Sequence, residues 1–175
     1  MALDLNDLSP QALWDTFAQF VAAKEPGTFE QVASMDNLAN EEGVGIALHA
    51  PALRLMVSLC ETLCVLGRHH WGEPDHLVER AKRDQIMPAK NAPAWLEDVL
   101  YPQGTPTMLF RVVGWNRKRK RGGPVIGFAY VDEYWGEMEP MDQYPVEGGG
   151  SGSWQITLTF GVLSRARSVY GPTSR

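Results

Sequence analysis

The hydrophobic pattern of this 175-residue chain changes its period at Tyr101-Pro102, and this change constrains the fold more than any other feature. Before that point, apolar residues recur at the spacing of amphipathic helices. After it, β-forming residues gather in runs with the two-residue alternation of strands. We therefore predict a single α+β domain over 1–175, in which a mostly helical part (1–100) packs on a mostly β part (101–175).

The first part predicts about four to five helices. Ser9-Pro10 is a favourable helix opening, because a serine N-cap accepts backbone hydrogen bonds and proline tolerates the first helical position. Pro26-Gly27 ends this helix. The strongest apolar stripe covers 51–66, and Gly67 is its predicted stop. Three further helices are expected over 28–40, 74–83 and 93–100.

The second part predicts an antiparallel sheet of about three strands, over 107–115, 125–135 and 154–162. In the last strand, apolar residues alternate with Gln155, Thr157 and Thr159, so one face should be buried and the other should face solvent. The glycine-rich tract 147–153 is interpreted as a flexible linker or a loop between strands.

Charge is distributed in blocks. Residues 101–130 hold six basic and no acidic side chains, whereas residues 131–150 hold six acidic and no basic ones. These adjacent blocks can neutralise each other across a hairpin or between subunits. The net charge of −5 argues against a protein coated with nucleic acid, although it leaves room for a local basic site.

A run of five basic residues lies between the first two predicted strands, so it should form the exposed tip of a hairpin. Adjacent cations repel one another, which favours contact with phosphates or with an acidic protein surface. The alternative is a solvated loop balanced by the carboxylates that follow. The predicted contact residues are Arg117, Lys118, Arg119, Lys120 and Arg121, Trp115 at the base, and Arg165 and Arg167; the acidic counter-surface is Asp132, Glu133, Glu137 and Glu139.

A second group combines thiol, imidazole and carboxylate side chains that can ligate zinc. Its spacing is not that of a zinc knuckle, and both cysteines lie in an apolar stripe, where a free cysteine behaves as a small hydrophobe. We therefore predict packed cysteines with capping or surface histidines, and neither a metal nor another cofactor. The group is Cys60, Cys64, His69, His70, Asp75, His76 and Glu79.

No catalytic motif stands out, since phosphate-binding glycine loops and a nucleophile elbow are both missing. We expect a non-enzymatic assembly or interaction protein, such as a phage neck, tail or capsid accessory component. It would dock other protein subunits, in a homo- or hetero-oligomer, through the basic hairpin and through strand pairing. The alternative is a nucleic-acid-binding module that uses the hairpin with Arg111, Arg165 and Arg167. A third hypothesis is a metalloprotein or enzyme built on the histidine and cysteine group.

The sequence also bears on location. The opening residues do not resemble a signal peptide. No stretch reaches the roughly 18 apolar residues that a membrane span needs. We therefore expect a protein of the cytoplasm or of a virion, without a membrane partner.

Overall fold

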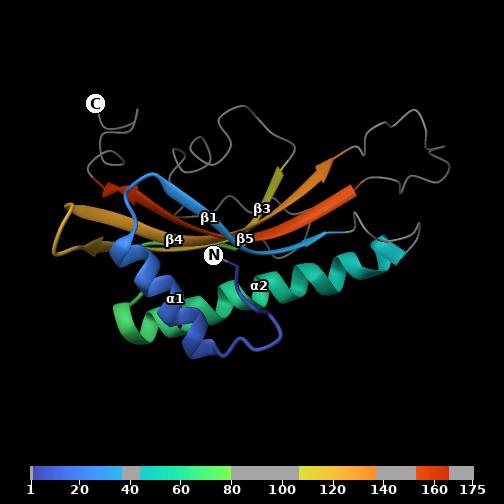
Figure 1. Ribbon diagram of the computed structural model, residues 1–175, viewed down its shortest axis with the longest axis horizontal. Coiled ribbons are helices and arrows are strands. Elements are labelled where there is room, and N and C mark those ends of the chain that lie inside the picture. Colours follow the sequence, from blue (N-terminus) through green and yellow to red (C-terminus); the bar gives the residue numbers. More distant parts are fainter. Residues whose placement is uncertain (1, 37–43, 80–106, 137–152, 166–175) are drawn as a thin grey trace.

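The computed structural model describes residues 2–36, 44–79, 107–136 and 153–165. These residues form one five-stranded antiparallel sheet in the order β1-β5-β4-β3-β2, and both helices lie on the same face of it (Figure 1). The expectation of four to five helices on a three-stranded sheet is therefore wrong. The described elements are α1 (Pro10–Ala23), β1 (Thr28–Asp36), α2 (Val44–Trp71), β2 (His76–Glu79), β3 (Thr107–Lys118), β4 (Pro124–Gly136) and β5 (Ser153–Ser164).

The first helix begins as predicted. The Ser9 hydroxyl oxygen accepts a hydrogen bond from the backbone N–H of Ala12 at 3.1 Å, which satisfies one orphan donor of the first turn. Gly27, with φ of +95°, then turns the chain into β1.

β1 replaces most of the helix that was expected over 28–40. Its pairing with β5 shifts register between Gln31 and Ala33, and this bulge buries the neighbours Val32 and Ala33 together. A regular strand sends neighbouring side chains to opposite faces. Because the bulge lets two neighbouring residues face the core, the apolar spacing of this segment resembles that of a helix.

β2 replaces the start of the helix expected over 74–83. Asp75, which suited the first turn of a helix, instead accepts a hydrogen bond from the backbone N–H of Asn116 at 2.7 Å. This contact holds the start of β2 against β3. Residues 80–83 and the helix expected over 93–100 lie outside the described residues.

α2 contains the predicted helix 51–66 but extends beyond both ends of it. Gly67 is not its stop. The Trp115 ring lies directly on the helix there, with Cζ2 only 2.0 Å from the position that a Cβ of residue 67 would take. The helix ends instead at Trp71, before Gly72 with φ of +85°, the left-handed conformation that glycine adopts without strain.

The inner side of α2 packs on the sheet. Met56, Cys60 and Leu63 are completely buried there. Leu48–Trp71 is long and apolar enough to cross a membrane, with a mean hydropathy of 1.5, but this test considers length and composition only. The core helix of a soluble protein can have the same length and composition, and 33% of this apolar window is buried inside the molecule.

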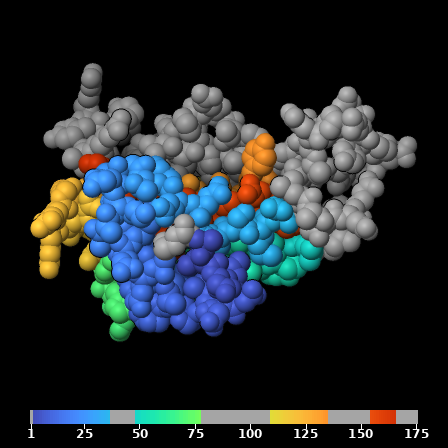
Figure 2. Space-filling model, in the orientation of Figure 1, coloured from blue at the N-terminus to red at the C-terminus, as the bar shows by residue number. Residues whose placement is uncertain are grey.

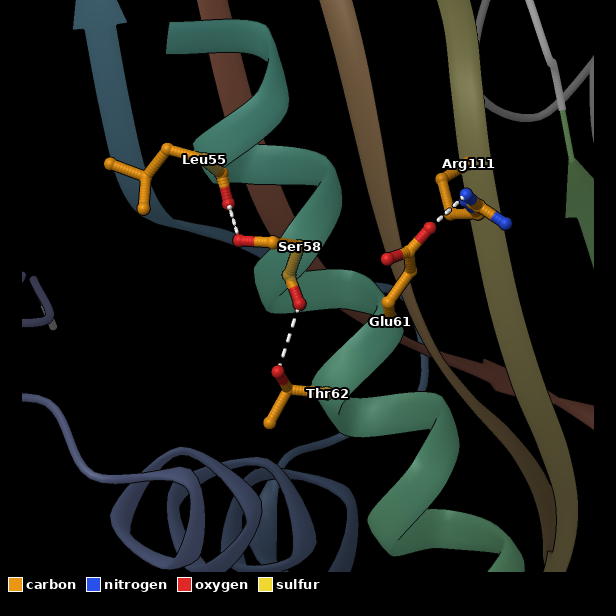
Figure 3. Close-up of polar contacts among 5 residues, drawn as sticks. All are labelled: Leu55, Ser58, Glu61, Thr62 and Arg111. Atoms are coloured by element: carbon orange, nitrogen blue, oxygen red, sulfur yellow. Dashed lines mark hydrogen bonds and ion pairs between the residues drawn. The ribbon is translucent and has the colours of Figure 1, made fainter. Parts of the chain in front are cut away.

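The outer side of α2 is shown in Figure 3. The hydroxyl groups of Ser58 and Thr62 donate to the helix's own carbonyls, those of Leu55 and Ser58, at 2.7 and 2.9 Å. Glu61 turns toward β3 and forms an ion pair with Arg111 at 2.5 Å. This pair ties the middle of α2 to the sheet.

The sheet is buried on both faces. The face toward the helices holds the main core, including Phe160 and Trp154 of β5. The other face holds a second apolar cluster around Phe128 of β4. Thr157 and Thr159, expected to face solvent, are only 5% and 4% exposed, so the predicted one-sided sheet is wrong.

Candidate functional site

The basic run lies at the hairpin between β3 and β4, but it is not all an exposed tip: Arg117 and Lys118 end β3, and Arg117 and Arg119 are half-buried. The ladder ends at the pair Lys118–Pro124, so Arg119 begins the turn. Gly122 and Gly123 complete the turn with φ of +84° and +74°, which glycine adopts without steric cost. In the space-filling view the hairpin projects from one end of the molecule, beside the blue N-terminal elements (Figure 2).

Arg117 is held against an aromatic ring. Its guanidinium carbon lies 4.2 Å from the ring centroid of Trp71, a cation–π contact. Trp71 is fixed in turn by edge contacts with Trp14 and Trp115, at centroid distances of 4.7 and 5.8 Å. Partial burial lowers the pKa of Arg117 from its ordinary value, but an arginine remains charged at neutral pH. The Trp71 ring therefore holds the guanidinium of Arg117 in a defined position.

Arg119 is held at the end of α1. Its Nη1 donates a hydrogen bond to the backbone carbonyl of Lys24 at 2.6 Å, and Lys24 is the C-cap residue of α1. A cation is favourable there because the C-terminal end of a helix carries partial negative charge. The Arg119 Nη2 lies 2.5 Å from where a Cβ of Gly122 would be, so glycine leaves the space that the side chain occupies.

These contacts create a groove of about 420 Å³ between α1 and the hairpin. Its apolar part comes from Ala18, Val21 and Ala22 of α1 and from Trp71, and its charged part is the basic run 117–121. α1 packs closely on β4 because residue 127 of β4 is a glycine. The methyl carbons of Val21 lie 2.5 Å from the position that a Cβ of residue 127 would take. Within the run, Lys118, Lys120 and Arg121 are exposed. The basic side chains of the groove can bind an anionic group, and its apolar part can bury an aliphatic group of the same ligand. We call it the hairpin groove.

Two predicted contact residues have other roles. Trp115 is 1% exposed, and its Nε1 donates to the carbonyl of Gly72 at 2.9 Å, so it cannot meet a partner. The alternation of β3 places it on the helix face of the sheet. Arg111 pairs with Glu61 of α2, far from the hairpin tip, because regular alternation along β3 places it on the same helix face as Trp115. Only its charge suggested a place in the basic site.

Of the two predicted C-terminal arginines, only Arg165 lies within the described residues. Ser164 pairs with Val125 at the base of the hairpin, so Arg165 lies at the same end of the sheet as the basic run. Arg167 is outside the described residues.

The predicted acidic counter-surface does not adjoin the basic run. Asp132 and Glu133 pair with Leu109 and Met108, at the other end of the hairpin from its tip. The two carboxylates also point to opposite faces of the sheet. Glu133 is completely buried, with Oε1 2.5 Å from Nε2 of His49, whereas Asp132 accepts a hydrogen bond from Thr157. Glu137 and Glu139 lie outside the described residues.

The residues of the cysteine and histidine group make separate contacts in different parts of the molecule. Cys60 faces the core, with Sγ 3.9 Å from the carbonyl oxygen of Ala129, and burial raises the pKa of its thiol. His70 stacks on Trp14 at 5.2 Å, and His76 Nε2 lies 3.2 Å from Asn116 Oδ1. Within the described ranges, no three of its residue types come together as a metal site would require.

Sequence reasoning missed the α1 side of the groove and Trp71. Ala18 and Ala22 are four residues apart on one helix face, and such small residues permit close approach of another element. That spacing was the only available signal, and it does not name the partner element.

Comparison with family models, with curated proteins and with solved structures finds no match to this chain.

Proposed function

We propose that this protein is a non-enzymatic docking protein that binds an acidic, aliphatic segment of a partner protein in the hairpin groove. One observation carries the proposal: Arg117 and Arg119 are fixed by Trp71 and by the Lys24 carbonyl above an apolar floor. Such a role suits an assembly or accessory component of a larger complex.

Fixed arginines favour binding more than a free basic loop does. An exposed ion pair contributes at most about 1 kcal/mol, partly because two long side chains must be ordered to form it. In Arg117 and Arg119 much of that order exists before a ligand arrives. Guanidinium N–H donors also suit a carboxylate, although Nη1 of Arg119 is already bonded to the Lys24 carbonyl.

The floor of the groove favours a peptide over a nucleic acid. Single-stranded nucleic acids bind by stacking bases on aromatic side chains along a basic groove. Here the floor residues from α1 are aliphatic, and one aromatic ring of the floor, Trp71, is covered by Arg117. Leucine, methionine or valine side chains suit such a surface.

The test compares two charge-matched double variants. Arg117→Gln with Arg119→Gln removes the two held cations, whereas Arg54→Gln with Arg68→Gln removes two exposed cations of α2 that do not line the hairpin groove. The probe is a fluorescein-labelled peptide of alternating glutamate and leucine, followed by fluorescence anisotropy. We expect the groove variant to bind about tenfold or more weakly, a change of about 1.4 kcal/mol, and the control to bind like the parent protein.

An oligothymidine of equal length distinguishes the alternative. If it binds more tightly than the peptide, and the groove variant loses that binding, the site is for nucleic acid. If the groove variant folds normally and binds the peptide as well as the parent protein does, the hairpin groove is not a docking site. Far-ultraviolet circular dichroism establishes that each variant is folded.

A further inference from the structure

We infer that the partner segment in the hairpin groove is supplied by a second copy of this chain, from its acidic stretch 137–147. This inference rests on the proposed function. It follows from the chemistry of that stretch and from where the sheet places its two ends.

The stretch matches the groove in composition. It contains four carboxylates and no basic residue, and apolar side chains are interspersed among the acids. The carboxylates suit the held guanidiniums, and the apolar side chains suit the floor of alanine and valine. The acidic residues are Glu137, Glu139, Asp142 and Glu147; the apolar ones are Met138, Met141, Tyr144 and Val146, beside two prolines.

β4 separates the groove from this stretch within one copy. Pro124 begins β4 beside the basic turn, and Gly136 ends it immediately before the acidic stretch. Twelve steps along a strand, at about 3.4 Å each, span about 40 Å. Figure 1 shows these two ends of β4 at opposite ends of the long axis of the sheet.

The acidic stretch cannot cross that distance to its own groove. Gly136 pairs with Ser153, so the chain leaves and re-enters the sheet at one place. No acidic residue of 137–147 is more than six residues from one of these two anchors. Six residues reach at most about 22 Å when fully extended, roughly half of what is needed. Only another copy can bring this stretch to the groove.

The resulting contact is head-to-tail. The groove at one end of a copy receives the acidic end of the next, so two different surfaces meet and each copy keeps one surface free. Such heterologous contacts continue into rings or filaments unless they close.

The test uses two variants that each lack one surface. The groove variant is Arg117→Gln with Arg119→Gln, and the acidic variant combines Glu137→Gln, Glu139→Gln, Asp142→Asn and Glu147→Gln. Sedimentation velocity over a wide concentration range gives the mass of each. We expect the parent chain to grow beyond a dimer as concentration rises and each variant alone to stay monomeric. Their mixture should form a complex of one copy of each and nothing larger.

The inference is overturned by a parent chain that stays monomeric at every concentration, or by a mixture that forms no complex. An acidic variant that associates like the parent chain also overturns it. The glutamate–leucine peptide then separates this failure from that of the proposed function. If the parent chain still binds the peptide through Arg117 and Arg119, a different protein fills the groove. If the peptide does not bind either, both proposals fall.

Discussion

Replacing Gly67 by alanine tests the aromatic packing that supports the hairpin groove. In the interior of an exposed helix, glycine to alanine is stabilising by about 1 kcal/mol. At this position the new Cβ would lie 2.0 Å from Cζ2 and 2.3 Å from Cη2 of Trp115. The ring cannot move aside freely, because its Nε1 is bonded to Gly72 and its edges contact Phe17 and Trp71.

The expected net effect is a loss of about 2 kcal/mol. Overpacking a filled core costs about 1–3 kcal/mol. Displacing Trp115 also weakens a partly buried hydrogen bond to Gly72, which costs about 1 kcal/mol more. These losses exceed the gain of about 1 kcal/mol in helix propensity. For a chain of this size, the melting temperature should fall by about 4–8 °C.

Thermal unfolding followed by circular dichroism measures this change, with Ser58→Ala as the control. Ser58 lies on the exposed side of the same helix, so alanine there should leave the melting temperature unchanged or slightly higher. In a Trp115→Leu background the cost of Gly67→Ala should largely disappear, because the clashing ring is gone. A higher melting temperature for Gly67→Ala in the parent chain would refute the packing of Trp115 on α2.

Two further predictions concern the face of the sheet away from the helices. Thr157→Asp should destabilise the fold by about 3 kcal/mol or more in urea unfolding, because it buries a second carboxylate beside Asp132, whereas Thr157→Val should cost far less. Burial first, and Asp132 second, raise the pKa of Tyr130 to about 12. Since a free tyrosine titrates near pH 10, the folded state keeps this proton longer, and stability should fall between about pH 10 and 12 by an amount that Tyr130→Phe removes.

The elements whose apolar residues follow one regular period could be predicted from the sequence. Ser9-Pro10 opened α1, the stripe over 51–66 became the middle of α2, and β3, β4 and β5 lie where alternation indicated. The other two strands, β1 and β2, were missed for different reasons. The bulge at Val32 gave β1 the apolar spacing of a helix, and β2 is a strand of only four residues, held against β3 by the side chain of Asp75 just before it.

The same division applies to the candidate site. The sequence by itself determined that the basic run lies at the hairpin between two strands, because glycines and flanking β-forming residues encode that turn locally. Only the tertiary structure decided that two of them are fixed by Trp71 and the end of α1, since those contacts join residues 46 and 95 positions apart. Local periodicity reports which face of an element is buried. Contacts between distant elements depend on how those faces pack together, and that information is present only in the folded chain.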